Sequence, residues 1–183
     1  MQPYFVRPSV HADWFVDGES EERIGAAFAA LGVLGQPEQP TVVTKVDMSK
    51  IIDPHLSKDG SDVAAHVDAS LQQSLARLRT DSLDVLLLHS FAGYREVHGG
   101  AAWKRLVELR NEGWVRRVGV SCYAPEEVME ALRDPDMRHI QLPCNLLDRR
   151  FKTAVFRAAC AARPDVTIHT RYASTHNYHS SVN

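Results

Sequence analysis

Residues 83–89 read LDVLLLH. A short and almost continuously apolar run of this kind is typical of a parallel strand that is buried on both faces. Similar runs occur before and after it, and each is a predicted strand: TVVTKV at 41–46, VRRVGVS at 115–121, HIQL at 139–142 and VTIHTR at 166–171. The N-terminal region adds at most one weak strand, PYFVR at 3–7.

Segments with helical periodicity separate these strands. The clearest is 61–79, where Val63, Val67 and Leu71 recur on one face. Further helices are predicted at 19–34, at 101–111, from Pro125 to just before Pro135, and at 150–162. Strands that alternate with helices predict an α/β fold with a parallel sheet, either open and doubly wound or closed into a barrel. No GxGxxG turn follows any strand, so the dinucleotide fold with that fingerprint is disfavoured.

The composition indicates one globular domain over residues 1–183. The chain is 44% hydrophobic and carries a formal net charge of -2, so we expect no nucleic-acid or membrane partner. The N-terminus lacks the pattern of a signal peptide, and we expect a cytoplasmic protein. The three cysteines have no CxxC spacing and are expected to be free thiols. Residues 1–18 and 172–183 are unpatterned and are expected to be divergent or loosely ordered ends.

Polar residues stand where the predicted strands end. They are Lys45, His89, Ser121, Gln141 and Arg171. In parallel α/β folds the carboxyl ends of the strands meet on one face of the molecule, and chemistry is concentrated there. Each of these residues could be an ordinary loop residue, but their recurrence at the same end of successive strands predicts a shared pocket.

Several phrases of the sequence resemble the aldo-keto reductase family, in the same order over roughly residues 15–171. They are SEERIG (20–25), VVTKV (42–46), SLARLRTDSLDVLLLHS (74–90), LVELRNEGWVRRVGVSCYAPEEVMEAL (106–132) and IQLPCNLLDRR (140–150). The resemblance implies a (β/α)8 barrel of the TIM type that binds NADP(H) at the carboxyl ends of its strands. It also implies hydride transfer between the nicotinamide and a small carbonyl substrate. The last phrase is similar to bacterial members that act on sugars or small aldehydes.

The family's catalytic tetrad is Asp, Tyr, Lys and His, and the resemblance assigns part of it here. Lys45 matches the lysine and His89 the histidine. Tyrosine donates a proton to the carbonyl oxygen, and the lysine lowers its pKa, because a phenol is otherwise a poor acid at neutral pH. Ser121 and Gln141 match positions that hold the nicotinamide carboxamide.

Three further residues are assigned by the same resemblance. Cys122 stands where the family commonly has an asparagine that contacts the cofactor. Arg171 is a candidate cofactor-binding residue. Asn145 lies in a segment that lines the substrate pocket.

The sequence departs from the family at the other two tetrad positions. Alignment on the Ser20–Glu21 pair puts Phe15 at the tyrosine and Val10 at the aspartate. Phenylalanine has no proton to give, and valine cannot pair with Lys45. A shifted alignment would offer Asp13 or Asp17 as the carboxylate, and the candidate substitute phenols are Tyr94, Tyr123 and Tyr172. The basic cofactor-binding segment that the family carries after its later strands is not recognisable, so we predict impaired activity.

Five or six strands do not close an eight-stranded barrel. We therefore predict an incomplete barrel whose open sheet edges favour self-association. The alternative to an impaired reductase is a non-catalytic subunit or remnant of the same family. A metal-dependent hydrolase barrel that uses His89 and His169 with an aspartate is a further alternative. We predict no metal site, because no HxH or HExxH spacing occurs.

Overall fold

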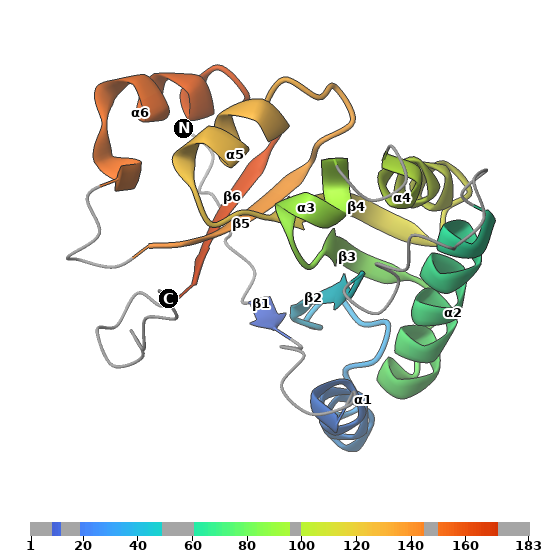
Figure 1. The fold of residues 1–183 in the computed structure, drawn as a ribbon. Coiled ribbons are helices and arrows are strands. Elements are labelled where there is room, and N and C mark those ends of the chain that lie inside the picture. The colour runs from blue at the N-terminus through green and yellow to red at the C-terminus, as the bar shows by residue number, and fades with distance from the viewer. Residues whose placement is uncertain (1–8, 12–18, 49–60, 96–99, 145–149, 172–183) are drawn as a thin grey trace, which may run out of the picture.

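The computed structural model describes residues 9–11, 19–48, 61–95, 100–144 and 150–171. Six strands form one sheet in the order β1-β2-β3-β4-β5-β6, and every neighbouring pair is parallel. The strands are β1 (Ser9–His11), β2 (Thr41–Val46), β3 (Leu83–Leu88), β4 (Val115–Ser121), β5 (His139–Pro143) and β6 (Thr167–Arg171). This is the predicted α/β architecture, an incomplete (β/α)8 barrel with strands in sequential order (Figure 1).

The helices lie on one side of the curved sheet, and they are α1 (Glu19–Leu31), α2 (Ser61–Leu78), α3 (Phe91–Arg95), α4 (Ala101–Asn111), α5 (Pro125–Ala131) and α6 (Ala154–Ala161). Figure 1 shows α5 and α6 beside β5 and β6 and α4 beside β3 and β4, while α2 packs between α1 and α4 and contacts β2. None of the described helices is long and apolar enough to cross a membrane.

Three local features differ from the expected elements or add to them. The strand expected at 3–7 lies outside the described residues, and the structure has an additional short strand at Ser9–His11. The helix expected at 150–162 begins at Ala154, because Thr153 caps it by accepting a hydrogen bond from the Phe156 amide at 3.2 Å, and Arg150–Lys152 is a separate 3₁₀ turn. Helix α3 has no counterpart among the expected elements.

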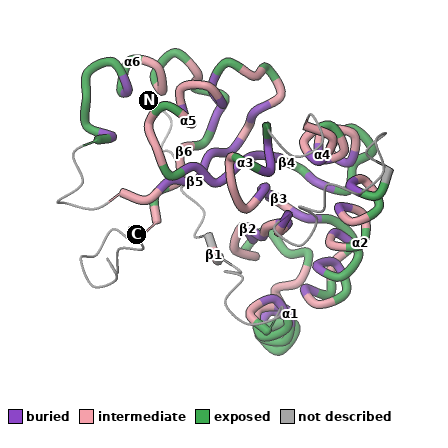
Figure 2. Tube along the Cα trace, viewed as in Figure 1, coloured by how far each residue is buried: buried purple, intermediate pink, exposed green. Residues whose placement is uncertain are grey.

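The two faces of the sheet bury different residues, because successive side chains of a strand point to opposite faces. Val42, Leu86 and Val118 lie on the face that the helices cover and belong to the main core. Val43, Val85 and Leu87 form a separate small cluster on the other face, which we call the inner face. Figure 2 shows buried residues along β3 to β5 and exposed residues on the outer sides of the helices.

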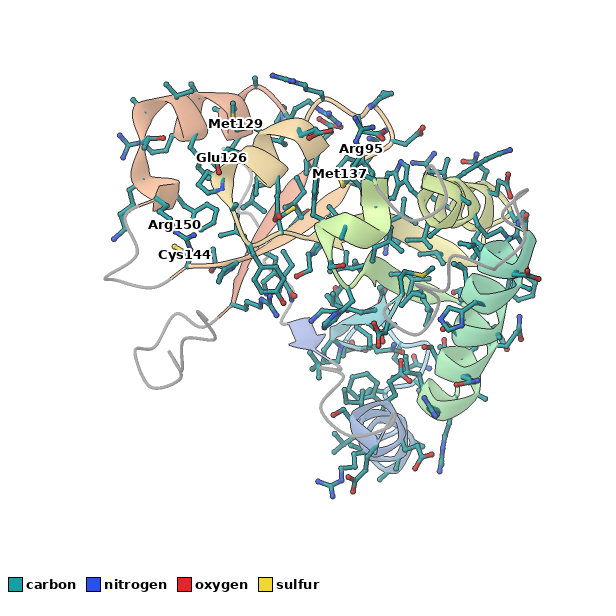
Figure 3. All side chains as sticks on the ribbon, in the orientation of Figure 1. Arg95, Glu126, Met129, Met137, Cys144 and Arg150 are labelled. Atoms are coloured by element: carbon teal, nitrogen blue, oxygen red, sulfur yellow. The ribbon has the colours of Figure 1, made fainter. Side chains whose placement is uncertain are left out.

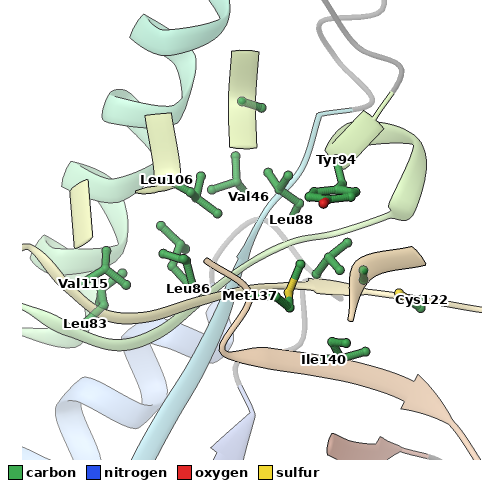
Figure 4. Close-up of a cluster of buried hydrophobic side chains, with 14 of the residues drawn as sticks. Val46, Leu83, Leu86, Leu88, Tyr94, Leu106, Val115, Cys122, Met137 and Ile140 are labelled. Atoms are coloured by element: carbon green, nitrogen blue, oxygen red, sulfur yellow. The ribbon is translucent and has the colours of Figure 1, made fainter. Parts of the chain in front are cut away.

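The main core fills the layer between the sheet and its helices. The apolar stripe predicted on α2 is confirmed: Val63, Val67, Leu71, Leu75 and Leu78 are all buried. Leu106 and Leu109 of α4 are also buried in this core. Figure 4 shows Leu86 and Leu88 of β3 gathered with Val46, Leu106 and Tyr94. Removal of this apolar area from water is the main stabilisation of the fold.

Two glycines are needed because the backbone comes very close to another segment. A Cβ built on Gly119 would lie 1.7 Å from the carbonyl oxygen of His139 on the neighbouring strand. A Cβ on Gly25 of α1 would lie 2.3 Å from the carbonyl oxygen of Arg77 on α2. Any side chain at either position would force the two segments apart.

Glu21 joins α1 to the sheet. Its buried carboxylate accepts a 2.6 Å hydrogen bond from the Thr44 hydroxyl of β2 and lies 3.5 Å from the Arg77 guanidinium of α2. A buried carboxylate is tolerated when hydrogen bonds and a cation compensate its lost hydration. The Ser-Glu pair that carries part of the family resemblance therefore fixes α1 against β2.

Candidate active site at the strand ends

The strand register places the candidate residues on one face. Lys45 pairs with Leu87 of the inner-face cluster, and Leu87 pairs with Gly119. Ser121 lies two residues beyond Gly119, so it points to the same face, and it pairs with Gln141. The inner face therefore presents Lys45, Ser121 and Gln141 near the carboxyl ends of three strands.

His89 continues this arrangement on β3. It follows the last residue of the strand, and its amide donates a 3.0 Å hydrogen bond to the Val46 carbonyl of β2. It lies two positions after Leu87, so it shares the inner face with Lys45. Both side chains are half-buried. The structure thus brings the lysine and the histidine to adjacent strand ends, where a carbonyl oxygen could contact both.

Ser121 and Gln141 form the most buried polar pair of the site. Their exposed fractions are 0% and 1%. The Ser121 hydroxyl has no hydrogen-bond partner among the residues that the structure describes. A buried hydroxyl without a partner costs free energy, and a ligand amide at this point would satisfy it. The pair therefore fits a carboxamide such as that of nicotinamide.

Arg171 is the last residue of β6, and both its side chain and its backbone contact neighbouring segments. Its register partner is Pro143, two residues beyond Gln141, so Arg171 also belongs to the inner face. Its guanidinium carbon lies 4.5 Å from the centre of the Tyr123 ring. The carbonyl of Arg171 accepts a 3.0 Å hydrogen bond from the Cys144 amide, which fixes the strand end against β5.

Two assigned residues have side chains on the opposite, helix-covered face. Cys122 is fully buried in the main core, and burial raises the pKa of its thiol, so the sulfur stays protonated. Its backbone still joins the site region, because its amide donates a 2.8 Å hydrogen bond to the Gln141 carbonyl. Val10 pairs with Val42 and packs against the same core. We therefore do not retain the Cys122 side chain among the proposed cofactor contacts.

Two of the tyrosines that could replace the missing catalytic tyrosine, Tyr94 and Tyr123, lie in different parts of the structure. Tyr94 lies in the helix layer, where its hydroxyl donates a 2.8 Å hydrogen bond to Asp134 and its ring packs edge-on against Trp103. Burial and the Asp134 hydrogen bond raise the pKa of Tyr94, which makes it a still weaker acid. Of the two described tyrosines, Tyr123 lies at the strand ends, where its ring contacts Arg171. Phe15, Asp13, Asp17, Asn145 and Tyr172 lie outside the described residues.

The histidines of the inner face do not assemble a metal centre in the described part of the chain. The rings of His139 and His169 lie 5.6 Å apart on neighbouring strands. Among the described residues, no group of three His, Cys, Asp or Glu side chains could hold a metal ion. The geometry thus gives no support to the hydrolase alternative.

A cavity of about 580 Å³ lies elsewhere, between α5 and the segment from Arg150 to Phe156. Figure 3 shows Glu126 and Met129 on α5 and Arg150 on the same side of the molecule. None of the lining residues belongs to a strand, and acidic and basic side chains are mixed at its rim. The strand ends therefore define the candidate site, and this cavity does not.

Sequence reasoning missed two contacts near the site. One is the stack of Arg171 on Tyr123. The other is the Glu127 carboxylate, which accepts hydrogen bonds from the amides of Tyr123 at 2.6 Å and Ala124 at 3.2 Å. The signal for the second was a glutamate two residues after Pro125, the arrangement that caps a helix start.

Comparison with known proteins identifies the family of this chain. The chain is 33% identical over 103 residues to methylglyoxal reductase DkgB of Escherichia coli, covering 56% of this chain and 34% of that protein. It is 30% identical over 86 residues to the uncharacterized oxidoreductase YqkF of Bacillus subtilis, covering 47% and 28%. The matched segments thus span about a third of each relative.

A solved structure shares the fold of this chain. An aldo-keto reductase from Klebsiella pneumoniae in complex with NADPH superposes with a TM-score of 0.62 and 25% identity, over 88% of this chain and 51% of that one. The model of the Aldo/keto reductase family matches residues 11–174. This match covers every described helix and every described strand except the first two residues of β1. The chain belongs to the aldo/keto reductase family.

Proposed function

We propose that this chain binds NADP(H) and a small carbonyl compound at its strand ends, and that its carbonyl reduction is weak or absent. The main support for this site is that four polar residues share one face of the sheet at the ends of four successive strands: Lys45, His89, Ser121 and Gln141. Such convergence of polar groups on the inner face of a parallel barrel is the usual place of its chemistry.

The cofactor assignment is supported by the NADPH complex of the Klebsiella pneumoniae relative. When bound, NADPH supplies the hydride that reduces the carbonyl carbon. In this chain the Ser121 hydroxyl and the Gln141 amide would hold the carboxamide of its nicotinamide. The unsatisfied, fully buried hydroxyl of Ser121 is the structural feature that fits such a ligand.

The two retained tetrad residues would act on the carbonyl oxygen. His89 would orient the carbonyl by a hydrogen bond, and the Lys45 ammonium would stabilise negative charge that develops on the oxygen. Completion of the reduction also needs a proton at that oxygen. The resemblance assigns that proton to a tyrosine, and Phe15 stands at its position. We therefore expect the hydride step to be slow even when both ligands bind.

A small aldehyde is the substrate class that we propose. The support is the similarity to methylglyoxal reductase DkgB.

The first test is thermal unfolding of the purified chain with and without millimolar NADPH. A ligand that binds only the folded state raises stability, by about 2.7 kcal/mol at a hundred times its dissociation constant. We expect an upward shift for the wild type and a smaller one for Ser121→Ala, which removes the proposed carboxamide contact. The absence of a wild-type shift would contradict cofactor binding.

The second test is NADPH oxidation with methylglyoxal by Phe15→Tyr, with Phe15→Leu as the matched control. We expect a gain of turnover only in the tyrosine variant, and its loss when Lys45→Met is added. If Phe15→Tyr binds NADPH but stays inactive, the chain is better described as a non-catalytic member of the family. The apolar Val10, packed in the main core, is the observation that favours this second reading.

We also propose that the chain self-associates. Within the described residues, β1 and β6 each pair with one neighbour, and the side chains of β6 are at most half-buried. An unpaired strand edge offers amide and carbonyl groups to another chain. Sedimentation velocity of the purified protein should show species larger than a monomer, whereas a single monomeric boundary at high concentration would contradict the proposal.

A further inference from the structure

We propose that Arg171 and Tyr123 form an oxyanion-binding subsite at the strand ends, in which Tyr123 positions the Arg171 guanidinium. The ligand group is a carboxylate or a phosphate. The inference rests on the proposed function only in placing this subsite next to the cofactor's carboxamide. Its own evidence is the stacking of the two side chains.

The Tyr123 ring lies against the Arg171 guanidinium. Its central carbon lies 4.5 Å from the ring centre of Tyr123, within the range of a cation–π contact. A guanidinium that lies over an aromatic ring still directs its N–H groups outward in its own plane, where they can bind two oxygens of one anion. The contact with Tyr123 therefore restricts the motion of a long side chain whose guanidinium group is suited to binding two oxygens of one anion.

Both partners are held by the backbone. The Arg171 carbonyl accepts a hydrogen bond from Cys144 of the strand end next to it. The amides of Tyr123 and Ala124 donate to the Glu127 carboxylate. Tyr123 is 45% exposed and belongs to neither core cluster, so apolar packing does not explain its position. These hydrogen bonds fix the backbone at Tyr123, and its ring contacts Arg171.

The position of the pair selects the ligand class. Arg171 and Gln141 share the inner face, and Tyr123 comes two residues after Ser121 on the neighbouring loop. An anionic group here would lie beside the proposed carboxamide site. Either a phosphate of the dinucleotide or a carboxylate on a small oxo acid would supply the same pair of oxygens.

The test compares Tyr123→Phe, which keeps the ring, with Tyr123→Leu, which removes it. Isothermal titration would measure binding of NADPH, inorganic pyrophosphate, pyruvate and the neutral ketone hydroxyacetone. We expect Tyr123→Leu to weaken anion binding by about 2-fold to 30-fold, and Tyr123→Phe to retain it. Arg171→Lys keeps the charge but loses the planar fork, and it should weaken the same anions without affecting hydroxyacetone.

The outcomes separate this inference from the proposed function. If Tyr123→Leu and Arg171→Lys weaken the binding of NADPH and pyrophosphate only, the subsite binds a phosphate. If they weaken the binding of pyruvate only, the subsite binds a substrate carboxylate. If NADPH fails to bind but pyrophosphate or pyruvate binds in an Arg171-dependent way, the subsite stands and the cofactor proposal fails. The inference is overturned if no anion binds, or if Tyr123→Leu matches Tyr123→Phe for every anion. Unliganded melting curves of each variant report whether it folds.

Discussion

The helix-covered face and the inner face of the same sheet use their buried positions differently. Leu86 and Leu87 are adjacent, and both are 0% exposed, yet they belong to separate clusters. The helix-covered face continues from Leu86 into a large apolar core. Beyond Leu87 the inner face turns to polar residues at Ser121 and Gln141. One face therefore supplies most of the stability, and the other carries polar groups at the strand ends, among them the Ser121 hydroxyl, which has no hydrogen-bond partner among the described residues.

The largest predicted effect tests this division directly. Leu86→Ala should lower the free energy of unfolding by about 4 kcal/mol, because it leaves a cavity in the main core. Leu87→Ala should cost about 2 kcal/mol, because its cluster has only two other described members. Urea denaturation of both variants measures the difference. Equal losses would mean that the inner face is packed as tightly as the helix-covered face.

A smaller effect is expected at Tyr94, within the helix layer. Tyr94→Phe removes the hydrogen bond to Asp134 and should cost about 1–2 kcal/mol of stability. NADPH affinity should be unchanged, since this phenol belongs to the main core and not to the inner face. Denaturation and titration of the same sample compare the two quantities. Reduced cofactor affinity at unchanged stability would assign Tyr94 to the site.

The smallest effect concerns Asp165, just before β6 and at the opposite end of that strand from Arg171. A hydrogen bond from Arg163, with further attraction from Arg138, lowers the pKa of the Asp165 carboxyl from 3.8 to about 2. A lowered folded-state pKa gives stability that is present above pH 3.8 and is lost as the pH falls through about 2.

Melting temperatures of the wild type and Asp165→Asn should therefore differ slightly at pH 4 and converge near pH 2. The difference is small because the carboxylate is exposed to solvent. A gap that persists unchanged at pH 2 would show that the effect of the substitution is not electrostatic.

The sequence predicted those elements whose signal is local. The apolar run of β3 and the periodic stripe of α2 were placed correctly, because burial on one or two faces leaves a pattern in the residues. Helix α3 was missed, since its five residues include a glycine and its stability comes from the packing of Tyr94 on Trp103. Strand β1 was not predicted, because its three residues form a strand only by pairing with β2.

The residues of the candidate site were predictable where they stand at the end of a recognisable strand. Lys45 and His89 end recognisable strands, so their shared face follows from the register. Strand alternation could also have assigned Cys122 to the face opposite Ser121. The contact between Arg171 and Tyr123 could not be predicted, because it joins the ends of two non-adjacent strands and leaves no periodic signal in the sequence.

The sequential strand order has a consequence for synthesis on the ribosome. Each strand pairs with the one made immediately before it, as Val43 with Val85 and Gln141 with His169. No described strand must wait for a distant later segment to find its place. Each emerging strand and helix can add to a growing edge, so loop closure stays short at every step. The nascent chain can thus assemble from its N-terminus onward, with the most recently added edge as the surface that needs protection from other chains.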